Sequence, residues 1–314
     1  MTSSDFPLHA VVVAALLLLL TPRGAFAAPD STNGSMTKCR DASPGNCRDA
    51  SLTGCPDASG SCDSLPRPVI SAYNVETGRA KLLSTYLSPL YYEGLDLALS
   101  GSWTKAFNHL PDKLLMRFEA SINFQNSFNP ARTARMIGLT ARFGWGIAWR
   151  MKFGNGWQVS TGGMVDIYGG ALYQPRNGNN PVTALAYAGI DATASVSYRF
   201  HIGRLPVVAC DEVRLPSLGA FFSPEYGEPY YEIYLGNKKG LSHLGWWGNA
   251  FAIDNLLSLK MDFGRTAMQV GYRFDVRSFW ANSLNTQVIR HAFVIGVIPN
   301  GMYIKKKQPV NLPF

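Results

Sequence analysis

The amino-acid sequence predicts an all-β fold, a closed antiparallel transmembrane β-barrel. Long segments alternate residue by residue between apolar and polar side chains, which is the pattern of strands with one apolar face. A short apolar run near the start has the character of an export signal. After residue 20, no stretch approaches the ~18 uninterrupted apolar residues that a membrane-spanning helix needs, which excludes a polytopic helical transporter.

The composition agrees with this fold class. The 314 residues are 46% hydrophobic and only 16% charged, and their mean hydropathy is −0.02. This balance is too apolar for a disordered chain and too even for a helical membrane protein.

The export signal lies at the start of the chain. Residues 10–20 form an apolar run, and the small-residue sequence AFAA follows at 25–28. The run is too short for a membrane anchor, and Pro22 ends it. We therefore expect residues 1–27 to be a secretory signal peptide of a Gram-negative protein.

A cysteine repeat follows the signal. An imperfect eight-residue unit places Cys39, Cys47, Cys55 and Cys62 among Ser, Gly, Asp and Pro, which cannot bury a core. The spacing is not that of a zinc site. Residues 28–70 are predicted to be a disordered linker, with a small disulfide-clasped module as the alternative.

Period-two alternation is clearest in residues 136–153. One set of alternate residues contains no polar group, whereas the other set carries Arg142, Arg150 and Lys152. On a helix these three charges would spread round the circumference, but on a strand they share one face. The same pattern recurs at residues 114–125, 187–202 and 268–277.

The length of these segments favours a barrel over a soluble β-sandwich. They run 12 to 18 residues, whereas sandwich strands usually have about 5 or 6 and a tilted membrane crossing takes about 9 to 11. Only a closed sheet pairs all its backbone amides in lipid.

The connections between segments predict the strand number. Tight links at 154–156, 203–206 and 264–265 alternate with longer polar ones at 126–135, 174–181 and 281–286. This alternation fits twelve strands if residues 81–90 are the first. Residues 236–249 could be a short strand or one long loop, so ten strands is the alternative. We expect the barrel at 71–304 and a basic tail at 305–314.

Several segments carry a family resemblance: SAYNVETGRA at 71–80, TYLSPLYYEG at 85–94, FFSPEYGEPYYEIYLGN at 221–237, FGRT at 263–266 and HAFVIGV at 291–297. They resemble an uncharacterised domain-of-unknown-function family of outer-membrane proteins from Bacteroidetes, over roughly residues 70–300. The resemblance implies an outer-membrane β-barrel with no established activity.

Charged residues on the polar faces are predicted to line the lumen. They are Arg117, Glu119, Arg142, Arg150, Lys152, Asp166, Asp191, Arg199, Asp254, Lys260, Asp262, Arg273, Asp275 and Arg277, with Glu232 and Arg290 as further candidates. About 8 strands make a barrel that side chains just fill, and 16 to 18 leave a channel. Two interpretations of these charges therefore remain. Opposite charges could pair across the interior and plug it, or the lumen could be a narrow solute pore.

Enzymatic chemistry has little support in the sequence. A phospholipase-like acyl hydrolase on a barrel needs a histidine and a serine two residues apart on one strand face, and no such pair exists here. His243, adjacent to Ser242, is the one enzyme candidate. No paired histidines suggest a metal, and no cofactor is expected.

The net charge of +8 does not by itself indicate a particular partner. The basic residues are interleaved within strands rather than gathered in a patch, which disfavours nucleic-acid binding. The expected partners are outer-membrane lipids, lipopolysaccharide and the barrel-assembly machinery. The sequence predicts a structural or accessory outer-membrane barrel or a narrow pore, with a lipid-modifying enzyme or a binding component of an envelope complex as alternatives.

Overall fold

A computed structural model describes residues 69–107, 113–178, 180–227, 229–236, 240–264 and 266–299. The expected signal peptide and basic tail lie outside the described residues. So does the expected linker, apart from its last two residues, which begin the first strand. Among the described residues, no helix has both the length and the apolar character to cross a membrane.

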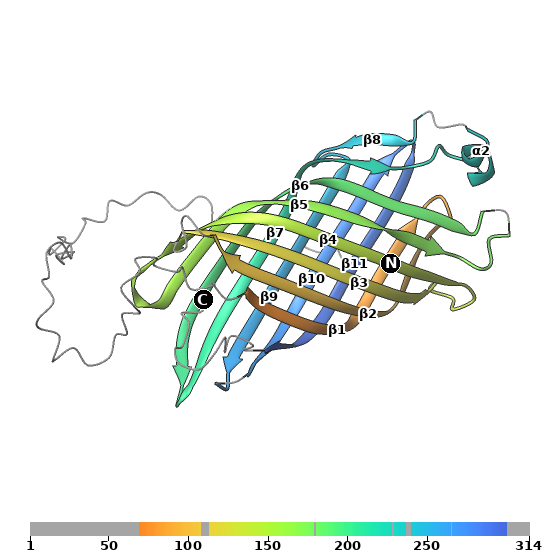
Figure 1. The fold of residues 1–314 in the computed structure, drawn as a ribbon. Helices are drawn as coiled ribbons and strands as arrows, with labels where there is room; N and C mark the ends of the chain where they lie inside the picture. Colours follow the sequence, from red (N-terminus) through yellow and green to blue (C-terminus); the bar gives the residue numbers. More distant parts are fainter. Residues whose placement is uncertain are drawn as a thin grey trace, which may run out of the picture. The chain divides into compact units, whose positions relative to one another are not determined.

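Strands make up nearly all of the described chain, and Figure 1 shows them side by side. They are β1 (Val69–Ser84), β2 (Ser88–Ala106), β3 (Leu114–Phe128), β4 (Arg135–Lys152), β5 (Trp157–Tyr173), β6 (Val182–Ile202), β7 (Leu205–Phe222), β8 (Ser242–Gly245), β9 (Ala250–Asp262), β10 (Thr266–Ala281) and β11 (Leu284–Pro299). The two short helices are η1 (Gly154–Gly156) and α2 (Tyr230–Tyr234).

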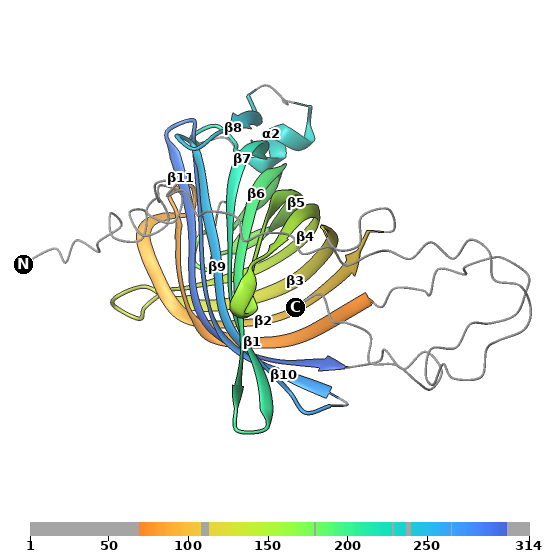
Figure 2. The same cartoon turned by 90° about the vertical axis from the view of Figure 1, so that its left-hand side faces the viewer.

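Ten strands close into an antiparallel barrel. Neighbours along the chain pair with each other from β1 to β7 and from β9 to β11, and two further seams, β1 with β11 and β7 with β9, complete the circle. Figure 2 shows these strands curving round a common interior. The predicted fold class is confirmed, and the barrel has ten strands, the number that was expected as the alternative. The preferred number, twelve, is wrong.

The overcount has two sources. Residues 81–90, taken as the first strand, contain the end of β1, the turn at 85–87 and the start of β2. Residues 236–249 contain β8, but this strand pairs only with the last four residues of β7 and never reaches the other side of the barrel. Together with α2 it lies at one end of the barrel (Figure 1).

The two ends of the barrel differ. The end where β1 starts and β11 finishes, here called the terminal end, has the tight links η1, 203–204 and 263–265. The opposite end, here called the far end, carries the turn at 85–87, the loops 129–134 and 174–181, and the long connection 223–249. The connection predicted at 281–286 is a two-residue turn instead, because Asn282 and Ser283 both adopt positive φ, 52° and 61°.

The outer face of the barrel is apolar. Large hydrophobic side chains are widely exposed there, for example Leu99 at 63% and Phe293 at 66%, whereas Asp96, Gln125 and Asp166 are 0% exposed. This is the reverse of a soluble protein, and a sandwich would have packed its apolar faces together. The distribution is that of a barrel with a polar interior and a surface suited to lipid.

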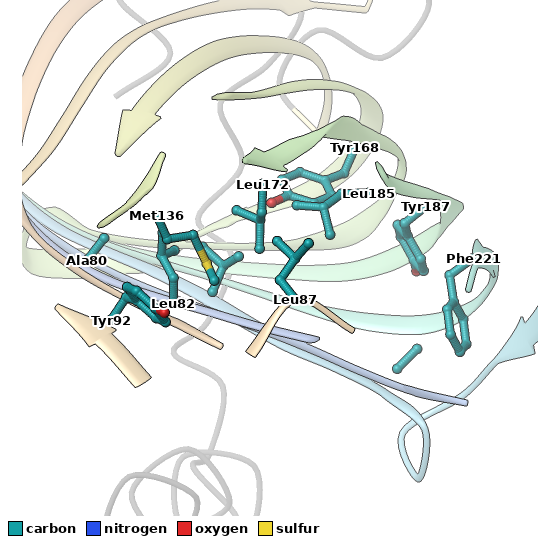
Figure 3. Packing of buried hydrophobic residues seen from close by; sticks show 12 residues of the cluster. Ala80, Leu82, Leu87, Tyr92, Met136, Tyr168, Leu172, Leu185, Tyr187 and Phe221 are labelled. Atoms are coloured by element: carbon teal, nitrogen blue, oxygen red, sulfur yellow. The ribbon is translucent and has the colours of Figure 1, made fainter. Parts of the chain in front are cut away.

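The far half of the interior contains a hydrophobic core, here called the far-end cluster. Its buried members are Ala80, Leu82, Leu87, Tyr92, Met136, Tyr168, Leu172, Leu185, Tyr187, Phe221, Ala250 and Val288. Figure 3 shows these side chains inside the ring of strands. Tyr92 is anchored because Gln174 donates a 2.7 Å hydrogen bond to its hydroxyl. The cluster thus places apolar side chains from most of the barrel strands inside the lumen at this end.

Candidate functional site: the lumen

Fifteen charged side chains form a continuous network inside the barrel, here called the ion-pair layer. It contains Arg117, Arg142, Arg214, Lys260, Arg273, Arg277 and Arg290, together with Glu76, Asp96, Glu119, Asp166, Asp191, Glu212, Asp254 and Asp275. Seven positive and eight negative groups nearly cancel. The layer is therefore close to neutral, with most of its charge compensated internally.

Arg142 on β4 is the central node of the layer. Its Nε lies 2.6 Å from Asp166, its Nη1 2.6 Å from Asp254 and its Nη2 3.5 Å from Asp191. Because β9, which carries Asp254, does not neighbour β4 in the sheet, this contact crosses the interior of the barrel. A single guanidinium thus joins four strands.

Arg277 and Arg290 are further nodes on the β10 and β11 side. Arg277 Nη2 donates to Asp166 at 2.9 Å, and its guanidinium carbon lies 4.3 Å from the ring centre of Tyr168, which is a cation–π contact. Arg290 donates to Asp96 at 3.0 Å and to Glu76 at 3.2 Å. Buried charges need such partners, because an unpaired one is very costly.

Towards the terminal end, the layer continues through Arg117. Its Nε lies 2.5 Å from Glu119, and it also pairs with Glu212. Arg214 pairs with Glu119, and Lys260 lies 3.5 Å from Glu212. These residues come from β3, β7 and β9, so the layer again bridges strands that are not neighbours.

Most of the lumen candidates from the sequence come together in this layer. Arg150 is buried at 5% exposure on β4, near the terminal end. Arg199 is exposed, close to the β6–β7 turn, and contributes nothing to the layer. Lys152 is also exposed, at the end of β4, and Glu232 lies on α2 outside the strands.

Four members of the layer were missed by the sequence reasoning: Glu76, Asp96, Glu212 and Arg214. Asp96 stands between Leu95 and Leu97 and Arg214 between Val213 and Leu215, whereas Glu76 and Glu212 each have one apolar and one polar neighbour. The alternation that identified Arg142 is therefore present at Asp96 and Arg214, and applying it there would have found these two residues.

A cavity of about 110 Å³ lies in the terminal half of the lumen, and residues of all ten barrel strands line it. Its wall carries the hydroxyls of Ser160 and Ser195, which are 2.6 Å apart. Beside them lies Glu212, the cross-strand partner of Ser195, which belongs to the ion-pair layer together with Arg117. Ligand sites for drug-sized molecules are about 300 to 1,000 Å³. This recess therefore suits water or a very small polar solute.

His243, the enzyme candidate, lies on β8 at the far end of the barrel, opposite Phe221 of β7. Its Nε2 is 3.2 Å from the Asn282 amide nitrogen, and its ring centre is 5.5 Å from that of Phe221. Neither of these two neighbours is a nucleophile or an acid. Within the described ranges, no group of three or more His, Cys, Asp or Glu residues is arranged to hold a metal.

Comparison with protein families identifies the chain. Residues 51–308 match a family described as "Protein of unknown function (DUF3316)". The chain belongs to this family. No curated protein matches the sequence. DUF3316 membership agrees with the resemblance to a domain-of-unknown-function family, and it assigns no activity.

Solved structures similar to this DUF3316 barrel are outer-membrane proteins. The β domain of the Bordetella autotransporter BrkA is 11% identical with a TM-score of 0.39, covering 74% of this chain and 98% of that one. The transport unit of the Escherichia coli autotransporter AIDA-I is 7% identical with a TM-score of 0.42, covering 76% and 92%. The E. coli outer-membrane protease OmpT is 6% identical with a TM-score of 0.40, covering 75% and 97%. Scores this low say nothing about activity.

Proposed function

We propose that this DUF3316 protein is a structural or accessory outer-membrane barrel with a closed lumen rather than an open pore. The observation that supports this most strongly is the filling of the interior. The far-end cluster occupies one half, and the ion-pair layer crosses the middle with its charges paired. The recess of about 110 Å³ at the terminal end is small, and further cavities among the described residues are smaller still, at about 30 Å³ and 10 Å³.

The orientation follows from the usual build of outer-membrane barrels, in which short turns face the periplasm and longer loops face outward. In this proposal the terminal end is periplasmic and the far end is extracellular. Lipopolysaccharide and lipid headgroups would meet the far rim, where Arg132, Arg135 and Arg176 lie in or beside the loops. The assembly machinery would receive the chain through β11.

Planar-bilayer recording tests the closed lumen. We expect the purified, refolded barrel to give no steady single-channel conductance. A variant in which Tyr92, Met136 and Leu172 are all replaced by alanine removes the centre of the far-end cluster and is expected to admit ions in brief openings. A stable conductance step from the unaltered protein would contradict the proposal and favour the narrow pore, with Arg142→Ala then expected to change its ion selectivity.

A folding control accompanies this recording. Each sample is compared by gel mobility with and without boiling, because closed membrane barrels resist detergent until heated. Absence of current counts only for samples that pass this control.

A further inference from the structure

Two of the polar residues on the outer face of the barrel lie together at the seam between β7 and β9. Along β7 the outward positions are Leu205, Val207, Ala209, Asp211, Val213 and Leu215; along β9 they are Phe251, Ile253, Asn255, Leu257, Leu259 and Met261. The direction is fixed by their neighbours, since Glu212 pairs with Arg117 of β3 and Asp254 pairs with Arg142 of β4, both across the interior of the barrel. Successive side chains of a strand point to opposite faces. Asp211 and Asn255 therefore face the lipid, each in the middle of an apolar run.

Asp211 and Asn255 are hydrogen-bonded to each other. The Asn255 amide nitrogen donates to Asp211 Oδ1 at 2.6 Å and makes a longer contact of 3.4 Å with the Glu212 carbonyl oxygen. Among the described residues, no contact engages the second carboxyl oxygen of Asp211 or the carbonyl oxygen of Asn255. Polar atoms without partners are expensive in hydrocarbon, and such residues usually face protein rather than lipid.

The surface beside the pair is unusually flat. On the neighbouring strand β6, the residues opposite Val213 and Leu215 are Ala194 and Ala192, both exposed, and Ala192 is in turn opposite Gly163 of β5. Side chains this small allow the backbone of another membrane protein to approach closely. The polar pair therefore stands at the edge of a surface that a second barrel can reach.

We propose that the Asp211–Asn255 pair is the centre of a lateral contact between two copies of this chain in the membrane. The proposal rests on the outer-membrane location proposed above. A twofold axis along the membrane normal places the pair of one copy against the pair of the other. The free carboxyl oxygen of Asp211 then accepts from the amide of Asn255 in the second copy, and the reverse bond forms at the same time.

The chemistry of the pair favours a second copy over an unrelated partner. A donor amide and an acceptor carboxyl stand side by side on one face, so the surface is complementary to itself under twofold rotation. In the contact, the Asn255 N–H that otherwise makes the 3.4 Å contact with the Glu212 carbonyl oxygen turns to the second copy. The unpartnered carboxyl oxygen of each Asp211 thereby gains a donor.

Sedimentation in detergent and disulfide cross-linking in native membranes test this contact. For cross-linking, Ala209→Cys is placed in a background in which the five native cysteines are serine. We expect a dimer in both measurements. Two reciprocal hydrogen bonds in a membrane are worth enough that Asp211→Leu with Asn255→Leu should weaken dimerisation by about ten- to a hundredfold.

Asn126→Leu is the matched control, because Asn126 is an outward polar residue on β3, between the buried Gln125 and Ser127 and distant in the sheet from β7 and β9. It should leave the dimer intact. A monomeric unaltered protein, a double variant that still dimerises, or a cross-link to a different protein would each overturn the proposal. If the protein is a monomer but is inserted in the membrane, heat-modifiable and non-conducting, the proposed dimer is wrong and the proposed closed barrel is still supported.

Discussion

Asp166 shows how the charged interior is stabilised at the level of single residues. Its carboxyl group is fully buried and receives hydrogen bonds from Arg142 at 2.6 Å and from Arg277 at 2.9 Å. Burying two opposite charges costs desolvation free energy, and their attraction offsets this cost only when the two groups are well placed. The arginines thus depend on Asp166 as much as it depends on them.

Replacing Asp166 by leucine leaves two buried guanidinium groups with incomplete pairing. We expect Asp166→Leu to lower the free energy of unfolding by about 3 to 5 kcal/mol, the range for breaking a buried ion pair. Denaturant unfolding of the barrel in lipid vesicles, followed by tryptophan fluorescence, measures this change.

Lys81→Met is the comparison for Asp166→Leu. Lys81 Nζ lies 3.1 Å from Glu93, but both side chains are largely exposed, at 42% and 65%. Exposed pairs contribute at most about 1 kcal/mol. Equal losses in the two variants would show that burial of the layer does not set its contribution.

The sequence predicts many of the charged residues that belong to the layer, but it does not predict which of them pair with each other. Alternation places Arg142 and Asp254 on polar strand faces, yet nothing in the sequence says that they meet across the interior, because that depends on the strand number and on the register. The lipid-facing Asp211 was missed for a related reason. Its neighbours Glu212 and Arg214 are also charged, so the break in the apolar face is visible only once the direction of β7 is known.

At the scale of elements, the β10–β11 turn has an identifiable weakness. Both central residues, Asn282 and Ser283, have left-handed backbone conformations, and a turn of this kind favours Asn followed by Gly. Asn282 also donates to the carbonyl oxygens of Pro224 and Gly240 at 3.1 and 3.2 Å, which ties the long 223–249 connection to the turn.

Ser283→Gly should therefore stabilise the barrel. A non-glycine residue in the left-handed region is strained by about 1 kcal/mol, so we expect a gain of about 0.5 to 1 kcal/mol in the free energy of unfolding. Ser283→Val, which is β-branched, should instead lose stability. The same vesicle unfolding assay separates the two, and an unchanged or lower stability for Ser283→Gly would count against a strained turn.

The strand boundaries explain where the sequence prediction worked and where it failed. The long alternating segments at 114–125, 136–153, 187–202 and 268–277 lie on strands, except for Phe153, which follows the end of β4. Alternation is weaker in β1, because its outward face carries Arg79 and Lys81 beside apolar residues, and the start of this strand was misplaced. β8 could not be distinguished from a crossing strand, since its four residues alternate like the others.

At the scale of the whole molecule, closure depends on the two most distant strands. Tyr73 of β1 pairs with Val297 of β11, and the seam continues to Ser84 and Thr286. Native contacts between residues this far apart in the chain are slow to form. The ends of β1 and β11 also lie side by side at the terminal end, where a short linker can join them.

A circular permutant tests whether the order of strands along the chain matters. Joining Val69 to Pro299 through a flexible linker and opening the chain between Pro130 and Ala131, in the loop 129–134, keeps every strand pair. We expect the permutant to fold into a heat-modifiable barrel with nearly unchanged stability, because exposed loops tolerate new termini. Opening the chain between Leu97 and Ala98, inside β2, is the control and should prevent closure.

The cross-barrel contacts of Arg142 also have a mechanical consequence. A hollow cylinder in a bilayer can be squeezed into an ellipse by lateral pressure, whereas one with rigid spokes cannot. Arg142 joins β4 to β9 and Arg277 joins β10 to β5, strands on different parts of the circumference, so these two arginines act as such spokes. The cross-section of this barrel should therefore stay round when the tension or the lipid composition of its membrane changes.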